Sequence, residues 1–354
     1  MKKHVFFFAT IAMGLTLFSC TQKPETATVS GLYPSKFEHL NDKGETNKLY
    51  VIKNANGMEV TVMNIGARIV SIAVPDKNGA MHNIVAGYDT ITPYLQLGNY
   101  HGAVVGRYGN RIAGGVIEIE RVKYRLRQND GEHTLNGGPR GFSSGFFEIE
   151  QPAESQLVCR YYSADDEQGF PSDVDLTVTY TLSDDNTLIF DYSASTSRRA
   201  TYINIFNRLN LNLAGATASS VDGQELYVDA ANYVPLNDEL IPSGAIAKVP
   251  ANLNFTTPHA LDAQTYNVCY VLNQPRTIER QAAALTNPEN GISVEIYTTE
   301  PSIQLTKDPT IGAAISLDAQ HFPDSPHHPE YPTTVLQKDS VFSSQTIYKF
   351  KLQN

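Results

Sequence analysis

The sequence contains no tryptophan and little cysteine, and the shortage of cysteine excludes a fold held together by disulfides. Among 354 residues there are three cysteines. Cys20 ends an apolar N-terminal run, which leaves Cys159 and Cys269 for the rest of the chain. These two lie in alternating apolar segments, LVCRYY and YNVCYVL. We therefore expect two buried free thiols rather than a bridge, because two cysteines form no disulfide framework.

Positive charge is also in short supply. The chain has 27 Lys and Arg against 37 Asp and Glu, a formal net charge of -10. This acidic balance argues against nucleic acid as a partner and against binding to an anionic membrane surface. The hydrophobic content of 41% is ample for a packed core, so the composition indicates a globular protein. No sequence pattern identifies a protein partner.

Helical periodicity is missing after the first 20 residues, and short alternating runs take its place. Side chains in such runs point alternately to two faces, as they do in β-strands. Examples are MEVTVMNI, RIVSIAV, DLTVTYTL, TLIFDYSAS, ISVEIYTTE and TIYKFKL. Turn sequences separate the runs at 54–57, 76–79, 183–186 and 287–291. With no linker and no repeat of fixed period, we predict one all-β domain over residues 31–354, a sandwich or barrel.

The first 20 residues have the features of an export signal. MKK is a basic start, and about 15 apolar residues follow, a length typical of a signal peptide and short of a membrane span. The LFSC at its end resembles a bacterial lipoprotein signal, in which Cys20 becomes the lipidated first residue. Ordinary cleavage is the alternative, because Phe18 fits the small-residue pattern poorly. We expect a lipoprotein-type signal peptide at 1–20 and a flexible tether at 21–30. The expected location is the periplasm, with the outer membrane contacted only through the lipid anchor.

The segment YINIFNRLNLNLAG at 202–215 raises a separate question. Its apolar residues recur at every second position, which predicts a strand with one buried face and one solvent-facing face. The polar face carries Asn204, Arg208, Asn210 and Asn212. Asparagine is a poor strand former, so three on one face need a reason beyond propensity. Either the face is an ordinary solvated one, or it lines a groove that hydrogen-bonds something polar.

Residues 102–115, GAVVGRYGNRIAGG, are more particular than a generic strand and turn. They resemble the signature of the aldose 1-epimerase (galactose mutarotase) family, in which a GR-x-x-NRI segment contributes Asn and Arg to the sugar. Further segments match in the same order: NDGEHTLNGGPRGF at 129–142, DEQGFPSDVDLTVTYTLSDDN, NRLNLNLAG, YVPLNDELIPSG, YTTEPSIQ and DAQHFPDSPHHPEYPTTVL. The resemblance covers nearly the whole chain after the signal. It implies an all-β fold, the galactose mutarotase-like antiparallel β-supersandwich, with a sugar groove across one face.

The resemblance also implies a chemistry. Members of that family interconvert the α and β anomers of a sugar: a Glu takes the proton of the C1 hydroxyl while a His protonates the ring oxygen. The ring opens, the aldehyde turns, and reclosure gives the other anomer. Such a site needs an acid and a base with pKa values near the working pH, held across the anomeric centre. Asn110, Arg111 and Gln304 match sugar-contacting positions of the family, and no cofactor is implied.

The positions of the family's proton carriers hold other residues here. Arg208 stands where the family keeps the proton-donating His, and Asn136 replaces the His of an LHGG motif. Asp318 stands at the position of the base Glu, one methylene shorter, and Asn267 corresponds to a sugar-contacting Asp. Arginine stays protonated and asparagine has no titratable proton, so neither can donate the proton that the histidine donates. We assign Asp318, Arg208 and Asn136 to the catalytic group, with Asp318 as base and Arg208 as its electrostatic partner.

These substitutions add positive charge to the site. The family's two neutral His, one Asp and one Glu have a formal charge of about -2, whereas the four residues present here sum to zero. A planar guanidinium suits bidentate recognition of a carboxylate or phosphate. We therefore hypothesise that the monosaccharide partner is an acidic sugar, such as a uronic acid. Two alternatives stay open: Arg208 stabilises charge on the ring oxygen of a slower epimerase, or it pairs with Asp318 in a site no longer used.

Two classes of function follow from this reasoning. One is an isomerase with an altered acid/base set, and the other is a carbohydrate-binding protein that keeps the groove and has lost the chemistry. His133, three residues before Asn136, is an alternative acid, although a loop histidine is more often simply exposed. His321, His327 and His328 have no metal-site spacing, so we expect no metal.

Overall fold

The computed structural model describes residues 25–96, 98–274 and 276–353. The expected signal peptide at 1–20, with Cys20, and the first part of the expected tether lie outside these residues. The described part of that tether contacts the domain. Val29 N donates to Glu59 Oε1 at 2.7 Å, and Ser35 N donates to Glu25 Oε1 at 2.5 Å. Within the described ranges no helix has the length and apolar character needed to cross a membrane.

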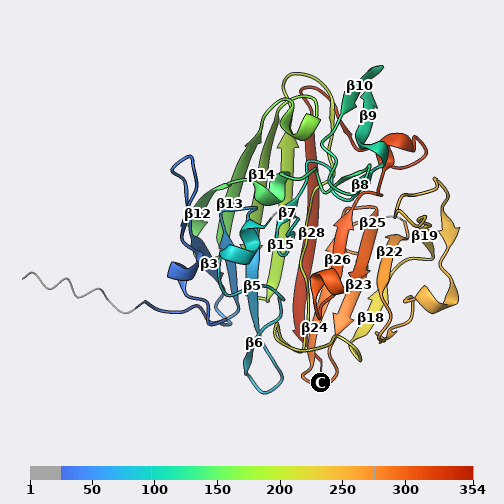
Figure 1. Cartoon of the computed structure of the whole chain (residues 1–354). Helices are drawn as coiled ribbons and strands as arrows, with labels where there is room; N and C mark the ends of the chain where they lie inside the picture. The colour runs from blue at the N-terminus through green and yellow to red at the C-terminus, as the bar shows by residue number, and fades with distance from the viewer. Residues whose placement is uncertain (1–24, 97, 275, 354) are drawn as a thin grey trace, which may run out of the picture.

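Three antiparallel sheets form the body of the domain (Figure 1). The largest has nine strands, in the spatial order β12 (Glu148–Ala153), β13 (Gln156–Ser163), β14 (Val174–Leu182), β15 (Thr187–Ser195), β28 (Val341–Leu352), β24 (Ile292–Thr298), β23 (Gln281–Thr286), β18 (Glu225–Val228) and β21 (His259–Ala260). A five-stranded sheet has the order β20 (Ala247–Lys248), β19 (Asn232–Val234), β22 (Tyr266–Val271), β25 (Ser302–Lys307) and β26 (Ser316–Gln320). A four-stranded sheet has the order β3 (Leu49–Lys53), β4 (Glu59–Met63), β5 (Arg68–Pro75) and β6 (Met81–Asn83).

Short ribbons and single helical turns make up the remaining regular structure. The two-stranded pairs are β1 (His39–Leu40) with β2 (Thr46–Asn47), β7 (Val104–Val105) with β17 (Phe206–Asn207), β8 (Arg111–Ile112) with β11 (Thr134–Leu135), β9 (Val116–Ile119) with β10 (Val122–Arg125), and β16 (Thr201–Tyr202) with β27 (Val335–Leu336). The 3₁₀ helices are η1 (Pro34–Phe37), η2 (Thr92–Leu95), η3 (Ala113–Gly115), η4 (Phe142–Ser144), η5 (Glu167–Gly169), η6 (Ala251–Leu253), η7 (Pro309–Ile311) and η8 (Ser325–His327).

Local sequence accounts for the hairpins. Residues 54–57 join β3 to β4, 76–79 join β5 to β6, 183–186 join β14 to β15, and 287–291 join β23 to β24. All four are turn sequences rich in Asn, Asp and Gly. The six alternating runs named above fall in β4, β5, β14, β15, β24 and β28, so the all-β prediction is confirmed.

One hydrophobic core joins the three sheets. It includes Ile72 of β5, Val178 of β14, Val294 of β24 and Leu305 of β25, all of them buried. In Figure 1 the four-stranded and five-stranded sheets lie over different halves of the long sheet, and this core fills the space between the layers. The two thiols predicted to be free and buried, Cys159 and Cys269, are both.

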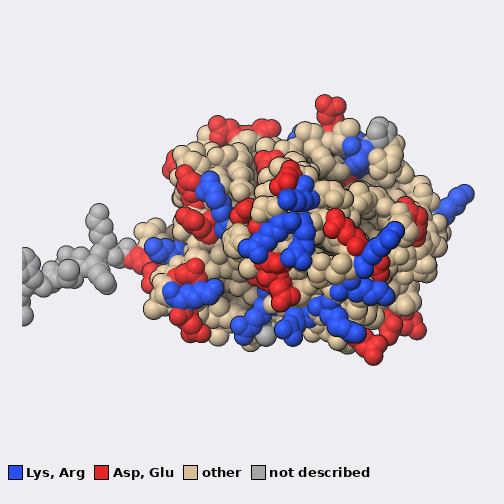
Figure 2. Space-filling view, turned by 90° about the horizontal axis from the view of Figure 1, so that it is seen from above, with Lys and Arg blue, Asp and Glu red and all other residues tan. Residues whose placement is uncertain are grey.

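Charged side chains are mixed on the surface. Figure 2 shows Lys and Arg interspersed with Asp and Glu on the face seen from above. Exposed pairs such as Arg160 and Glu150, 2.9 Å apart, each contribute little to stability because water screens them. The mixture is typical of a solvated surface.

In the central segment at 201–213 the polar side is not an ordinary solvated face, and two of its four polar residues, Arg208 and Asn210, line a cavity, in agreement with the groove alternative. Only β16 and β17 are regular strands within it. The three asparagines of its polar face are fully buried: Asn204, Asn210 and Asn212. Asn204 Nδ2 donates to Gly109 O at 3.0 Å, and its Oδ1 accepts from His321 N at 2.9 Å. The alternation therefore reflects a segment buried on both faces, in which the amides of Asn204 and Asn212 bond main-chain groups.

Asn207 fixes this central segment against the long sheet. Tyr192 Oη donates to Asn207 Oδ1 at 2.8 Å, and Asn207 Nδ2 donates to Tyr180 Oη at 2.8 Å. Tyr180 in turn donates to Ala67 O at 2.8 Å. Because Asn207 directly precedes Arg208, these three bonds fix the point from which the Arg208 side chain begins.

We expect Tyr180→Phe to lower the free energy of unfolding by about 1–3 kcal/mol, because it removes the donor to the Ala67 carbonyl and the nearer of the two acceptors of Asn207 Nδ2 in the core. The matched control is Tyr162→Phe, since Tyr162 is 55% exposed. Urea unfolding of both variants measures the difference. Equal effects of the two substitutions would contradict the role assigned to Tyr180.

Candidate functional site

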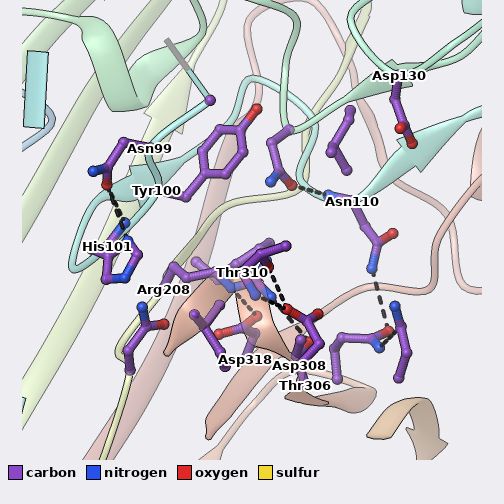
Figure 3. Close-up of a pocket in the computed structure, with 18 of the residues that line it drawn as sticks. Asn99, Tyr100, His101, Asn110, Asp130, Arg208, Thr306, Asp308, Thr310 and Asp318 are labelled. Carbon is purple, nitrogen blue, oxygen red and sulfur yellow. Dashed lines mark hydrogen bonds and ion pairs between the residues drawn. The ribbon is translucent and has the colours of Figure 1, made fainter. Parts of the chain in front are cut away.

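A cavity of about 570 Å³ opens beside the central segment. Every residue that the sequence assigned to catalysis or sugar binding lines it: Asn110, Arg111, Asn136, Arg208, Asn267, Gln304 and Asp318. Figure 3 shows Arg208 above Asp318, with Asn110 to one side of this pair and Asn99 and His101 to the other. The fold thus brings together side chains from stretches far apart in the sequence.

Asn110 and Asn136 lie opposite each other at one end of the ribbon of β8 and β11. Both have left-handed backbones, with φ of 65° and 53°, a conformation that Asn adopts more readily than most residues. Asn136 Oδ1 accepts from Asn110 N at 2.8 Å, and Asn136 N donates to Asn110 O at 2.9 Å. Asn136 therefore has a backbone role, and its Nδ2 is the group left for a ligand.

Asn110 also begins a row of side-chain amides across the five-stranded sheet. Its Nδ2 donates to Gln304 Oε1 at 3.3 Å, and Gln304 Nε2 donates to Asn267 Oδ1 at 2.7 Å. Gln304 of β25 pairs with Asp318 of β26, and Asn267 of β22 pairs with Thr306 of β25. Since each amide offers donors and an acceptor, the row suits hydroxyl groups, which also have both.

Arg208 and Asp318 form an ion pair at the same cavity. Arg208 Nε lies 3.3 Å from Asp318 Oδ2, and Arg208 Nη2 donates to Thr306 Oγ1 at 3.0 Å. The Arg208 side chain is 16% exposed and that of Asp318 only 1%. Burial raises the pKa of Asp318 to about 6, against the opposing charge of Arg208 and a hydrogen bond from Ser316. The carboxyl group therefore titrates near neutral pH, the range that suits a proton acceptor.

A known family of proteins matches the part of the chain that contains all seven predicted site residues. The family model described as "Aldose 1-epimerase" matches residues 48–349. The chain belongs to the aldose 1-epimerase family.

Curated relatives agree with this assignment, and a solved structure supports the fold. The chain is 30% identical over 335 residues to an aldose 1-epimerase of Haemophilus influenzae, covering 87% of this chain and 97% of that protein. It is 28% identical over 319 residues to human galactose mutarotase, covering 83% and 92%. A solved aldose epimerase homologue from C. elegans has a TM-score of 0.82 at 24% identity, covering 87% and 100%. The predicted galactose mutarotase-like sandwich is therefore confirmed.

In this member of the aldose 1-epimerase family, both arginines of the cavity are paired. Arg111 Nε lies 2.6 Å from Asp130 Oδ2, and Arg208 Nε lies 3.3 Å from Asp318 Oδ2. Asp308 also lines the cavity and accepts from Thr310 N at 2.8 Å. Two Arg against three Asp give the lining a formal charge of -1 when all five are ionised. Among the described residues, the cavity offers no unpaired cation.

His101 lines the cavity of this epimerase-family chain, although the sequence reasoning did not select it. Asn99 Nδ2 donates to Pro93 O at 3.0 Å, so its Oδ1 faces His101 and can only accept. His101 Nδ1 lies 3.1 Å from that oxygen and therefore carries the ring proton, which leaves a lone pair on Nε2. Burial, with the charges of Arg68 and Arg208, lowers the pKa of His101 to about 4 and keeps the ring neutral at pH 7.

A signal for His101 was present in the sequence. It directly precedes the family motif at 102–115, and the first glycine of that motif bonds the central segment, since Gly102 N donates to Arg208 O at 2.7 Å. Tyr100, one residue earlier, also lines the cavity, and its Oη accepts from Asn129 Nδ2 at 3.3 Å. The sequence reasoning overlooked Tyr100 and His101, two polar aromatic residues directly before the motif at 102–115.

The other histidines considered from the sequence do not line the cavity: His133, His321, His327 and His328. His133 Nδ1 accepts from Gly114 N at 3.1 Å, and His321 Nδ1 lies 2.6 Å from Glu300 Oε2. Within the described ranges, no group of three or more His, Cys, Asp and Glu is arranged to hold a metal ion.

We expect Asp318→Asn to raise the melting temperature at pH 8 and to change it little at pH 4. The pKa of Asp318 in the folded protein, about 6, is above the ordinary value of 3.8, so folding favours the protonated carboxyl. The contribution of this carboxyl to folding stability is complete below about pH 4 and is lost as the pH rises through about 6. The neutral isostere removes that loss, which is on the order of 1–3 kcal/mol. Calorimetry at the two pH values measures this difference, and a lower melting temperature at pH 8 would contradict it.

Proposed function

We propose that this protein interconverts the α and β anomers of a monosaccharide. The observation that carries the proposal is the convergence of the sugar-contacting and proton-carrying positions of the family on one open cavity. Its volume of about 570 Å³ is within the range of ligand-binding pockets. The names of the relatives, aldose 1-epimerase and galactose mutarotase, support a sugar as the substrate.

Asp318 is the base in the proposed mechanism. Its pKa of about 6 leaves it mostly ionised at pH 7, so it can take the proton of the C1 hydroxyl. The electrons of that O–H bond form the C1 carbonyl while the bond from C1 to the ring oxygen breaks. Arg208 and the Nδ2 of Asn136 stabilise the negative charge on the ring oxygen until a solvent proton neutralises it. Rotation of the aldehyde and the reverse steps give the other anomer.

Binding without turnover is the second candidate, and the burial of Asp318 favours it. The Asp318 side chain is 1% exposed, and Arg208 is the more accessible member of their pair. A base has to come within hydrogen-bond reach of the proton it removes, so turnover requires the incoming sugar to move Arg208 aside. Without that movement the amides of Asn110, Gln304 and Asn267 hold a sugar and no chemistry follows.

An acidic sugar remains a hypothesis for the substrate, and the charges of the cavity weigh against it. The guanidinium that prompted the hypothesis is 3.3 Å from Asp318, and Arg111 is 2.6 Å from Asp130. A sugar carboxylate would have to displace one of these partners to gain a bidentate contact. The pairs therefore favour a neutral aldose.

We expect freshly dissolved α-galactose or α-glucose to reach anomeric equilibrium faster with the protein than in buffer, as followed by polarimetry and proton NMR. Asp318→Ala should slow the catalysed rate by about 100-fold or more, because general bases contribute factors of that size. Asp42→Ala, at an exposed position, is the control.

The sugars and the assay together separate the candidates. Calorimetric binding with no acceleration for any sugar would establish binding without turnover. A clear preference for α-galacturonic acid over the neutral sugars would support the acidic-sugar hypothesis. If no sugar is bound or converted, both candidate functions are wrong.

We also propose that the chain is exported and anchored through a lipid on Cys20, on the strength of the sequence at 1–20. Cells fed radioactive palmitate should label the protein and retain it in the membrane fraction. Cys20→Ala should abolish both the label and the retention. An unlabelled wild-type protein in the soluble periplasmic fraction would show ordinary cleavage instead.

A further inference from the structure

The cavity is larger than one sugar ring requires. Its volume is about 570 Å³. Pockets of about 300–1,000 Å³ hold drug-sized ligands, whereas a hexose has about twelve non-hydrogen atoms. In Figure 3, Asn110 and Asp130 lie to one side of Arg208, where the proposed monosaccharide site is. Asn99 and His101 lie to the other side, in a part of the cavity to which the proposed function gives no role.

We call this second part the distal lobe and define it by four lining residues, Tyr88, Asn99, His101 and Asn210. Main-chain bonds hold its walls against the central segment. Ala86 N donates to Asn210 O at 2.8 Å, and Gly102 N donates to Arg208 O at 2.7 Å. The segments that carry Tyr88 and His101 therefore both lie alongside residues 208–210, next to the ion pair of the monosaccharide site.

The polar groups of the distal lobe match a ligand that can both donate and accept hydrogen bonds. His101 Nε2 has a lone pair, because Asn99 holds the ring proton on Nδ1. A hydroxyl can donate to it, whereas a carboxylate or phosphate cannot. Asn210 lies deeper, fully buried, and neither of its amide atoms has a partner among the described residues. An apolar ligand would leave such groups unpaired, at a cost of about 1–3 kcal/mol each.

Tyr88 adds a flat aromatic surface to these polar groups. It is 39% exposed, and its ring centroid lies 5.4 Å from that of His101. A ligand that has both hydroxyl groups and an apolar face of C–H groups matches this combination. A pyranose ring has this chemistry, and the absence of an unpaired cation in the described lining makes an anion a poor match.

We propose that the distal lobe binds a second sugar unit, so that the preferred substrate is a reducing disaccharide or longer oligosaccharide. This inference rests on the proposed function, because it places the reducing ring in the monosaccharide site. The second unit is joined to a hydroxyl other than that on C1, since anomer exchange needs a free C1 hydroxyl. His101 accepts a hydrogen bond from the second unit, and the Tyr88 ring packs against its face.

The test compares kcat/KM for glucose with those for maltose and isomaltose, which carry a second glucose on O4 and O6 of the reducing ring. We expect the wild-type protein to prefer at least one disaccharide by about fivefold or more, the size of one net hydrogen bond plus packing. His101→Phe and Tyr88→Ala should remove that preference and leave the value for glucose within about twofold, since one hydrogen bond to the distal unit is absent for glucose. His101→Gln, which retains an acceptor, should keep part of the preference.

Three results would overturn the inference, and they are distinguishable from one another. Equal kcat/KM values for glucose and both disaccharides in the wild-type protein would show that the lobe binds no second unit. Equal losses on glucose and disaccharides in His101→Phe and Tyr88→Ala, with native circular dichroism, would assign these residues to the monosaccharide site. If calorimetry and NMR detect no interaction of the wild-type protein with any of the three sugars, the proposed function fails and this inference fails with it.

Discussion

The structure depends on satisfying the polar groups of a chain segment that passes through its interior. From 201 to 213 every residue except Arg208 is buried, and regular strand pairing covers only part of this length. Buried main-chain groups without partners are costly, and Asn204, Asn207 and Asn212 of this segment supply partners for such groups. Asn204 bonds the main chain on two sides, and Asn207 bonds two tyrosines of the long sheet. The one side chain left partly exposed is the arginine that reaches the cavity.

Arg208 pairs with Asp318, and its charge offsets only part of the energetic cost of burying that carboxylate. Asp318 Oδ1 has no partner among the described residues, and the net effect of its surroundings favours the protonated form. A buried ion pair repays the loss of water only when its remaining lone pairs are also bonded. With Arg111 paired to Asp130 as well, five charged residues produce a lining close to neutral. Recognition in this cavity therefore depends on the direction of hydrogen bonds more than on net charge.

The sequence predicted features that depend on neighbouring residues better than features that depend on residues far apart in the chain. Hairpins followed from turn residues at 54–57 and 183–186, because a turn is determined by its own few residues. The seven residues chosen from the motif positions all line the cavity, since a family resemblance already contains the outcome of long-range packing. Alternation at 202–215 predicted two faces but not what covers the second one, which depends on residues far away in sequence, such as His321, whose N donates to Asn204 Oδ1. The tautomer of His101 could not be predicted, because it follows from the orientation of the nearby Asn99 amide, which is fixed only in the folded chain.

The two buried thiols have a consequence for where this fold can form. Cys159 and Cys269 are free and lie in different sheets, and burial raises the pKa of both, that of Cys269 to about 12. The thiolate is the form that reacts with oxidants and disulfides, and at these pKa values almost none is present at neutral pH. The domain therefore has no cross-link to gain in an oxidising compartment and none to lose in a reducing one. Once folded, the domain therefore keeps the same covalent structure in oxidising and reducing surroundings.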